Sequence, residues 1–110
     1  MAELLITDLR HFLDEAGEII PEPAHVKALA SYLTAIVLMS SYPDSERPAE
    51  YIVTCRKRPK RKPCHGEVFG FIIPDSGNIM WMCPECNNRG LISNWRGTIW
   101  DLSEYRKIAH

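Results

Sequence analysis

The chain has 110 residues, 45% of them hydrophobic and 25% charged, which is typical of a compact globular protein and excludes a wholly disordered one. The first twenty residues contain five acidic side chains and no basic start before an apolar run, so we expect no secretory signal peptide. The most apolar stretch, residues 28–39, is shorter than the roughly 20 residues that span a bilayer. We therefore expect a soluble, cytoplasmic protein that does not enter a membrane.

The net charge of −1 conceals an uneven distribution of charged residues. Residues 1–50 contain three Lys or Arg against nine Asp or Glu, whereas residues 51–110 contain ten against five. An asymmetry of this kind indicates an interaction surface on the basic half, or two halves that attract each other.

Two helices are predicted in the N-terminal part of the chain. Residues 7–16 are predicted to form a short helix, because Thr7 or Asp8 can cap its start and apolar residues follow at helical spacing. Gly17 suits the end of that helix. A longer helix is predicted over residues 23–41, where apolar side chains recur at steps of three and four. Together they would form a helical hairpin.

The period of the apolar residues changes to two after a polar, proline-containing linker at residues 42–50. Three strands are predicted, at residues 51–55, 67–73 and 79–83, because these segments are rich in β-branched and aromatic residues. Residues 74–78 are predicted to form a turn in which Gly77 or Asn78 has a positive φ. Residues 91–95 and 98–100 are candidates for two more short strands.

The four cysteines form the strongest motif of the sequence. Cys83 and Cys86 are separated by two residues, so both sulfurs can face one point on a tight turn, and Asn87 suits the left-handed position after it. Cys55 and Cys64 flank the loop between the first two predicted strands. In a three-stranded meander this loop and the 83–86 turn lie at the same end of the sheet. We therefore predict one structural Zn2+ ion bound by the four cysteines.

Three alternatives to this site are open from the sequence. A redox pair at Cys83 and Cys86 is disfavoured, because the pair ends a strand outside any βαβ unit. Iron competes with zinc for a site of four thiolates, since tetrahedral sulfur suits both ions. His65 could replace a cysteine in a site of three cysteines and one histidine, but adjacent side chains seldom reach one ion, and this would leave Cys64 without a role.

Residues 51–101 resemble the zinc-ribbon superfamily. The wider pattern is similar to small bacterial proteins with a helical N-terminus and a C-terminal four-cysteine zinc ribbon, through Cys55-Arg56, Pro63-Cys64-His65-Gly66, Ile79-Met80-Trp81-Met82-Cys83-Pro84-Glu85-Cys86, Gly90, Ile92, Trp95-Arg96-Gly97-Thr98 and Trp100-Asp101. Two features depart from the common ribbon: eight residues separate the first two cysteines, and Asn87 replaces the usual glycine. The resemblance implies a fold and a metal but no activity.

These observations predict an α+β fold, with an N-terminal helical hairpin packed on a small antiparallel three-stranded zinc-ribbon-like sheet. The helical segment would comprise residues 1–45 and the ribbon-like domain residues 51–102, as two parts or as one compact unit. Trp81, Trp95 and Trp100 are expected mainly in the core, with stacking on unpaired bases as the alternative.

Six of the eight residues between Cys55 and Cys64 are cationic, which favours contact with the phosphates of nucleic acid. They are Arg56, Lys57, Arg58, Lys60, Arg61 and Lys62. The alternative is a solvated loop, or one that docks on the acidic half of the chain. A different function is that of a protein-interaction adaptor, which binds a protein partner or forms a homodimer through the acidic helices. We expect neither enzymatic activity nor a small-molecule substrate, because four cysteines fill the coordination sphere of zinc.

Overall fold

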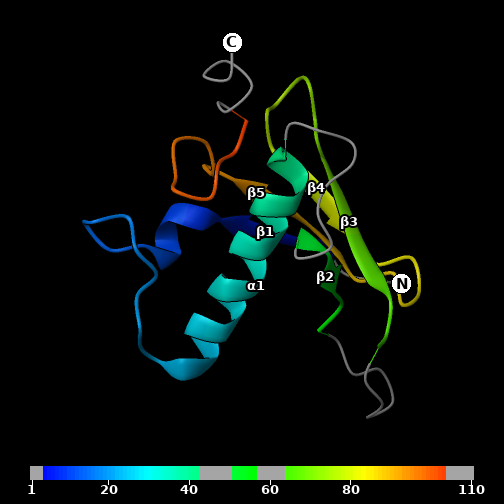
Figure 1. Ribbon diagram of the computed structural model, residues 1–110, viewed down its shortest axis with the longest axis horizontal. Coiled ribbons are helices and arrows are strands. Elements are labelled where there is room, and N and C mark those ends of the chain that lie inside the picture. Colours follow the sequence, from blue (N-terminus) through cyan, green and yellow to red (C-terminus); the bar gives the residue numbers. More distant parts are fainter. Residues whose placement is uncertain (1–3, 43–50, 57–63, 104–110) are drawn as a thin grey trace.

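A computed structural model describes residues 4–42, 51–56 and 64–103 of the protein (Figure 1). The strands form one mixed sheet in the order β1-β5-β4-β3-β2, in which β1 and β5 pair in parallel and the other neighbours are antiparallel. The elements in chain order are β1 (Leu4–Asp8), the 3-10 helix η1 (Leu9–Phe12), α1 (Ala24–Ser41), β2 (Val53–Thr54), β3 (Glu67–Ile72), β4 (Ile79–Met82) and β5 (Arg89–Ser93).

The predicted helical hairpin on a three-stranded antiparallel sheet is wrong. Across residues 4–42, 51–56 and 64–103 there is one α-helix, and the sheet has five strands of mixed direction. The error lies in residues 7–16, where the end of β1 is followed by a single 3-10 turn and, from residue 13 onward, by non-helical backbone. Asp8 does cap that turn, accepting a hydrogen bond from the Arg10 amide, but the backbone returns to an extended conformation at Leu13.

The physical reason for the difference is a distant pairing. β1 aligns with β5 so that Leu4 faces Arg89 and Asp8 faces Ser93, and the Ser93 hydroxyl donates to the Thr7 carbonyl. Backbone hydrogen bonds to a strand that is 86 positions away therefore override the helical spacing of the local apolar residues.

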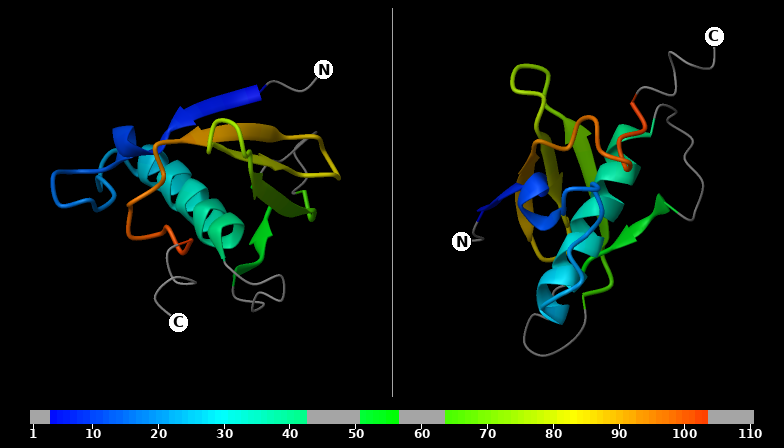
Figure 2. Two further views of the ribbon diagram at one scale, coloured as in Figure 1. Left: turned by 90° about the horizontal axis from the view of Figure 1, so that it is seen from above. Right: turned by 90° about the vertical axis from the view of Figure 1, so that its left-hand side faces the viewer.

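The second predicted helix is confirmed as α1, which crosses one face of the sheet (Figure 2). Its closest approach is to β3: a Cβ atom at Gly70 would collide with the Ser40 hydroxyl, so glycine is needed where the helix meets the strand. By length and composition α1 could also span a membrane, a property that core helices of soluble proteins share. Its buried residues are Ala30, Leu33, Thr34, Ile36, Val37, Met39 and Ser41.

The three predicted strands are present as β2, β3 and β4 and pair as an antiparallel meander. The candidate strand at 91–95 is present with an earlier start, as β5, whereas residues 98–100 form a turn. Most of the predicted linker, from residue 43 onward, lies outside the described residues. Gly77 has the expected positive φ of 76°.

The core lies between α1 and the sheet. Trp81 and Trp95 are each 1% exposed, which confirms them as core residues and removes them as stacking platforms. Trp100 is partly buried against the same core. The Trp95 indole donates a hydrogen bond to the Gly77 carbonyl, so its polar group is satisfied.

The face of the sheet opposite α1 is apolar. The register aligns Ile6, Leu91, Met80 and Phe71 in one row across β1, β5, β4 and β3, and Phe69 and Met82 pair beside them. Ile6, Phe69 and Phe71 are 70%, 44% and 51% exposed. Among the described residues no helix covers this side (Figure 2). We call these six residues the open face.

Candidate metal centre

The four cysteines lie at one end of the sheet, at the ends of four strands. Cys55 follows β2 and Cys64 precedes β3, while Cys83 follows β4 and Cys86 precedes β5. The Cys55 amide donates to the Gly66 carbonyl over 2.9 Å, which extends the β2–β3 pairing to the site. Antiparallel topology therefore brings together thiols that are up to 31 positions apart.

The sulfur atoms have the separations of a four-coordinate metal site. All four Sγ atoms lie within 4.8 Å of one another, and the pairs Cys55–Cys86 and Cys64–Cys83 are each 3.6 Å apart. Four sulfurs placed about 2.3 Å from a zinc ion at the corners of a tetrahedron are about 3.8 Å apart. A disulfide requires about 2.05 Å between its sulfurs, far less than these separations. The donor set therefore fits a metal ion that prefers thiolate.

The turn from Cys83 to Asn88 is closed by two backbone hydrogen bonds. The Asn87 amide donates to the Cys83 carbonyl and the Cys83 amide to the Asn88 carbonyl, both over 2.8 Å. Asn87 has a φ of 63°, the predicted left-handed conformation. Burial raises the pKa of the Cys83 thiol, but the backbone N–H groups of Cys86 and Glu85, together with the neighbouring Cys64 and Cys86 thiols, hold that pKa below its ordinary value. The turn thus favours the thiolate that a metal requires.

Residues 64–66 form the second part of the site. The Gly66 amide donates to the Cys64 sulfur over 3.4 Å. This contact lowers the pKa of Cys64, but burial and the neighbouring thiols of Cys83 and Cys86 raise it by more. Gly66 is packed so tightly that a Cβ atom there would lie 2.5 Å from the Cys83 sulfur. Only glycine therefore fits between the two ligand-bearing segments.

His65 is exposed and is not part of the cluster of ligand atoms. Four sulfurs converge without it, so the arrangement gives no support to a site of three cysteines and one histidine. The Cys83–Cys86 turn joins two antiparallel strands, whereas the redox motif considered from the sequence belongs to a βαβ unit.

Helix α1 contributes a side chain beside the cysteines that the sequence did not reveal. The Tyr32 ring meets Trp81 edge to face, with the ring centroids 5.8 Å apart. The Arg56 guanidinium lies over the same tyrosine, 5.6 Å from the ring centroid. Burial, followed by the nearby Cys55 thiol, raises the pKa of Tyr32 well above its ordinary value. The one sequence signal for this contact is the position of Tyr32 among the apolar residues of the predicted helix.

The predicted cationic segment is described at one residue only. Arg56 is exposed and directly follows Cys55, a candidate metal ligand. Lys57, Arg58, Lys60, Arg61 and Lys62 lie outside the described residues, so the predicted loop stays a prediction.

These features define an α+β protein with a cluster of four cysteines that could hold a metal ion. The cluster is compatible with a zinc-ribbon-like site, set here in a larger sheet. Comparison of the chain with protein-family models, with curated proteins and with solved structures gives no match.

Proposed function

We propose that this protein is a structural zinc module that binds a macromolecular partner. The observation that carries the zinc assignment is the convergence of four Sγ atoms within 4.8 Å. Zinc suits this donor set because it accepts tetrahedral thiolate coordination without a redox change. Four protein ligands would fill the coordination sphere and leave no position for a substrate, so the proposal assigns the ion a structural role.

The fold supports a structural role for the ion. The candidate ligands lie in two separate parts of the chain, Cys55 and Cys64 beside β2 and β3, and Cys83 and Cys86 beside β4 and β5. These parts meet through the β3–β4 pairing and the common core. Metal ions that join such segments contribute directly to the free energy of folding. When bound, zinc would hold the β2–β3 connection against the β4–β5 turn.

Native mass spectrometry tests the metal assignment. The protein purified without added metal is expected to carry one ion of zinc mass per chain, and a chelator is expected to remove it with loss of near-ultraviolet circular dichroism. Detection of iron in place of zinc would change the identity of the metal but would still support a metal site at the four cysteines. A metal-free chain with intact tertiary structure would contradict the proposal.

We propose nucleic acid as the partner, bound through the cationic residues 56–62. The support is their composition and their position between two ligands, with exposed Arg56 as the described start. If three to six cations neutralise phosphates, duplex affinity falls with log salt at a slope of about −3 to −5. The combined K57Q and R58Q variant should make this slope shallower by about 2, because two phosphate contacts are lost. The combined K27Q and R89Q variant should leave the slope unchanged. A slope near zero would contradict this part of the proposal.

The open face favours a second candidate function, self-association. Contiguous exposed apolar surface of this kind marks interaction sites in soluble proteins, and two sheets can pack face to face at about 10 Å. The charges beside the open face favour a second copy of this chain as the molecule that covers it. Arg89 and Glu67 are both exposed beside the open face, on β5 and β3, and neither forms an ion pair among the described residues. A two-fold axis along β4 places the β5 of one copy over the β3 of the other, which brings unlike charges together.

Molecular mass measured by light scattering tests this candidate. Phe71→Glu should convert a dimer to a monomer, whereas Ile99→Glu, at a residue 70% exposed outside the open face, should not. Arg89→Glu should weaken the dimer, and the added change Glu67→Arg should restore it. A monomer at all concentrations, or no restoration by the second charge reversal, would exclude the self-association.

A further inference from the structure

A second polar site lies at the opposite end of β4 from the cysteines. A pocket of about 220 Å³ opens between η1, the turn before β4 and the segment after β5. Two arginines, Arg10 and Arg96, line it together with Ser76, Asn78 and Asn94, and none of the described acidic residues does so. The site is therefore positively charged and rich in hydrogen-bond donors.

The Arg96 guanidinium is held in place by apolar and aromatic contact. It lies over the Trp95 ring, 4.7 Å from the centroid, while Trp95 is buried and tied to the Gly77 carbonyl. A Cβ atom at Gly77 would come within 3.6 Å of Arg96 Nε, so the turn also lies against this side chain. Among the described residues the guanidinium makes no hydrogen bond. Its donors are positioned but unused.

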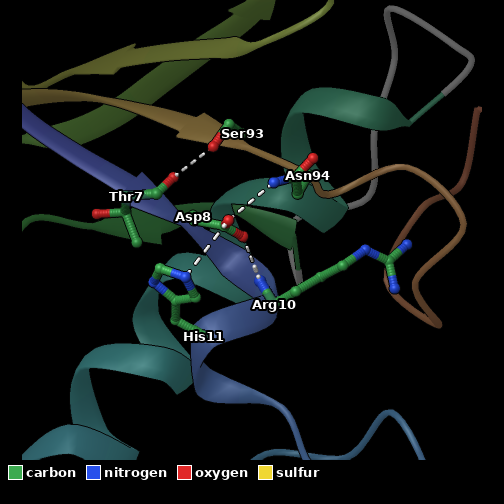
Figure 3. Close-up of polar contacts among 6 residues, drawn as sticks. All are labelled: Thr7, Asp8, Arg10, His11, Ser93 and Asn94. Carbon is green, nitrogen blue, oxygen red and sulfur yellow. Dashed lines mark hydrogen bonds and ion pairs between the residues drawn. The ribbon is translucent and has the colours of Figure 1, made fainter.

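The Arg10 guanidinium reaches the same place from η1. Its Nη2 donates to the Arg96 carbonyl over 2.6 Å, which orients the fork and leaves further N–H groups available. Figure 3 shows the Arg10 side chain extending away from Asp8 toward the segment that follows β5. Two guanidinium groups thus approach one pocket although their residues are 86 positions apart in the chain.

The nearby acids are occupied by other groups. Asp8 accepts hydrogen bonds from the Asn94 side chain over 2.8 Å and the Arg10 amide over 3.0 Å, and His11 lies 3.6 Å away (Figure 3). Asp101 accepts from the Gly97 amide and from Ser103, and its carboxylate interacts with Arg96 through charge, without an ion pair at contact distance among the described residues. The guanidinium groups are therefore not neutralised by a bidentate carboxylate of this chain within its described part.

We propose that this pocket binds a phosphate group through Arg10 and Arg96. Guanidinium forks match phosphate oxygens in geometry and charge. The donors come from three different segments, which suits a tetrahedral anion that accepts from several directions better than a planar carboxylate. The site is independent of the proposed metal, because its residues lie at the far end of β4 and β5 from the cysteines.

Nuclear magnetic resonance of the full-length chain tests the site, with inorganic phosphate as the probe and sodium chloride at matched ionic strength as the control. Phosphate should shift the Nε–Hε signals of Arg10 and Arg96 and the Gly77 amide along one saturable curve. Arg96→Gln and Arg10→Gln should each weaken phosphate binding by about tenfold or more, since each removes charged hydrogen bonds. Lys27→Gln, at an exposed lysine outside the pocket, should change it less than twofold.

Two competition experiments show whether the bound phosphate group belongs to a small molecule or to a nucleic-acid backbone. Competition by a nucleoside monophosphate but not by a short oligonucleotide assigns a small ligand, and competition by both assigns a backbone phosphate as well. Arg96→Lys keeps the charge and should bind more tightly than Arg96→Gln. The proposal is overturned if acetate displaces phosphate at equal concentration, if Lys27→Gln weakens binding as much as Arg96→Gln, or if the wild-type shifts lie at the cysteine end. The metal content of the Arg10 and Arg96 variants should equal that of the wild type, so failure of this proposal can be distinguished from failure of the metal proposal.

Discussion

The ring of Tyr32 on α1 and the indole of Trp81 on β4 meet edge to face, with their centroids 5.8 Å apart. Trp81 is separated from Cys83 by one residue and points to the same side of the sheet, toward the helix. The contact therefore joins the helix to a strand that carries a candidate metal ligand. Stability of the helix packing and integrity of the cysteine cluster should be linked through this pair.

Substitutions of Tyr32 should separate the contribution of its ring from that of its hydroxyl. The hydroxyl is buried and has no hydrogen-bond partner of good geometry among the described residues. Tyr32→Phe should therefore leave the free energy of unfolding unchanged or raise it by up to about 1 kcal/mol. Tyr32→Ala should lower it by about 2 to 3 kcal/mol through loss of packing. Urea denaturation measures both, and equal losses would show that the hydroxyl has a partner.

Gly66→Ala should damage the metal centre by steric contact alone. The added Cβ would lie 2.5 Å from the Cys83 sulfur and 2.7 Å from Glu85 Cγ, so the two ligand segments must separate. Metal affinity, measured by competition with a chromophoric chelator, should fall by at least about tenfold, as for disrupted supporting contacts of metal sites.

Gly17→Ala is the matched control. Gly17 has a φ of 81°, and no contacting atom of the described part of the chain lies within 4 Å of the added Cβ. This variant should lose about 1 kcal/mol of stability from backbone strain, with metal affinity unchanged. Equal metal affinity in both variants would contradict the close packing described for Gly66.

Cys86→Ser should remove the metal and loosen the whole fold. The sequence alone predicts unfolding of residues 51–100, but α1 packs on the same core as the cysteine-bearing strands. Loss of the ion should therefore lower the thermal midpoint of the helix and the sheet together. Pro84→Ser, at an exposed residue of the same turn, should keep the ion. Circular dichroism with metal analysis distinguishes them, and a folded, zinc-bearing Cys86→Ser protein would refute the assignment.

Asp101 should contribute stability that depends on pH. Burial raises the pKa of this carboxyl, but hydrogen bonds from Ser103 and the Gly97 amide, together with the positive charge of Arg96, outweigh burial, so the pKa lies below its ordinary value. A lowered pKa in the folded state means that the carboxylate stabilises the protein above about pH 4 and loses this effect as pH falls through the folded pKa.

Asp101→Asn is therefore expected to be less stable than the native protein at pH 7, with a difference that shrinks below about pH 4. Any metal that is released at low pH is released from both proteins. The difference between their thermal midpoints at each pH therefore reports on Asp101 alone. A difference that is constant from pH 7 to pH 3 would show that the carboxylate charge has no role.

Much of the sheet and the helix could be predicted because their signals are local. The apolar steps of three and four define α1, and the alternation in residues 67–72 and 79–82 defines β3 and β4. The gathering of the cysteines followed from the meander alone, since Cys55, Cys64 and Cys83 stand at strand ends. Asn87 could be assigned a positive φ from its place after the second cysteine of the turn.

The missed features depend on contacts that no local pattern encodes. Leu9, Phe12 and Leu13 have helical spacing, yet the preceding segment is a strand because β5 offers it an unpaired edge. The packing of Tyr32 against Trp81 requires the crossing point of α1 on the sheet, which is set at Gly70. The arginine pocket likewise combines η1 with residues after β5, whose proximity follows from the β1–β5 pairing.

That parallel pairing also has a consequence for synthesis. β1 leaves the ribosome well before β5, and it cannot pair with β5 until residues 89–93 have emerged. Until then β1 carries unpaired amides and carbonyls beside the apolar Ile6, a combination that favours pairing between growing chains.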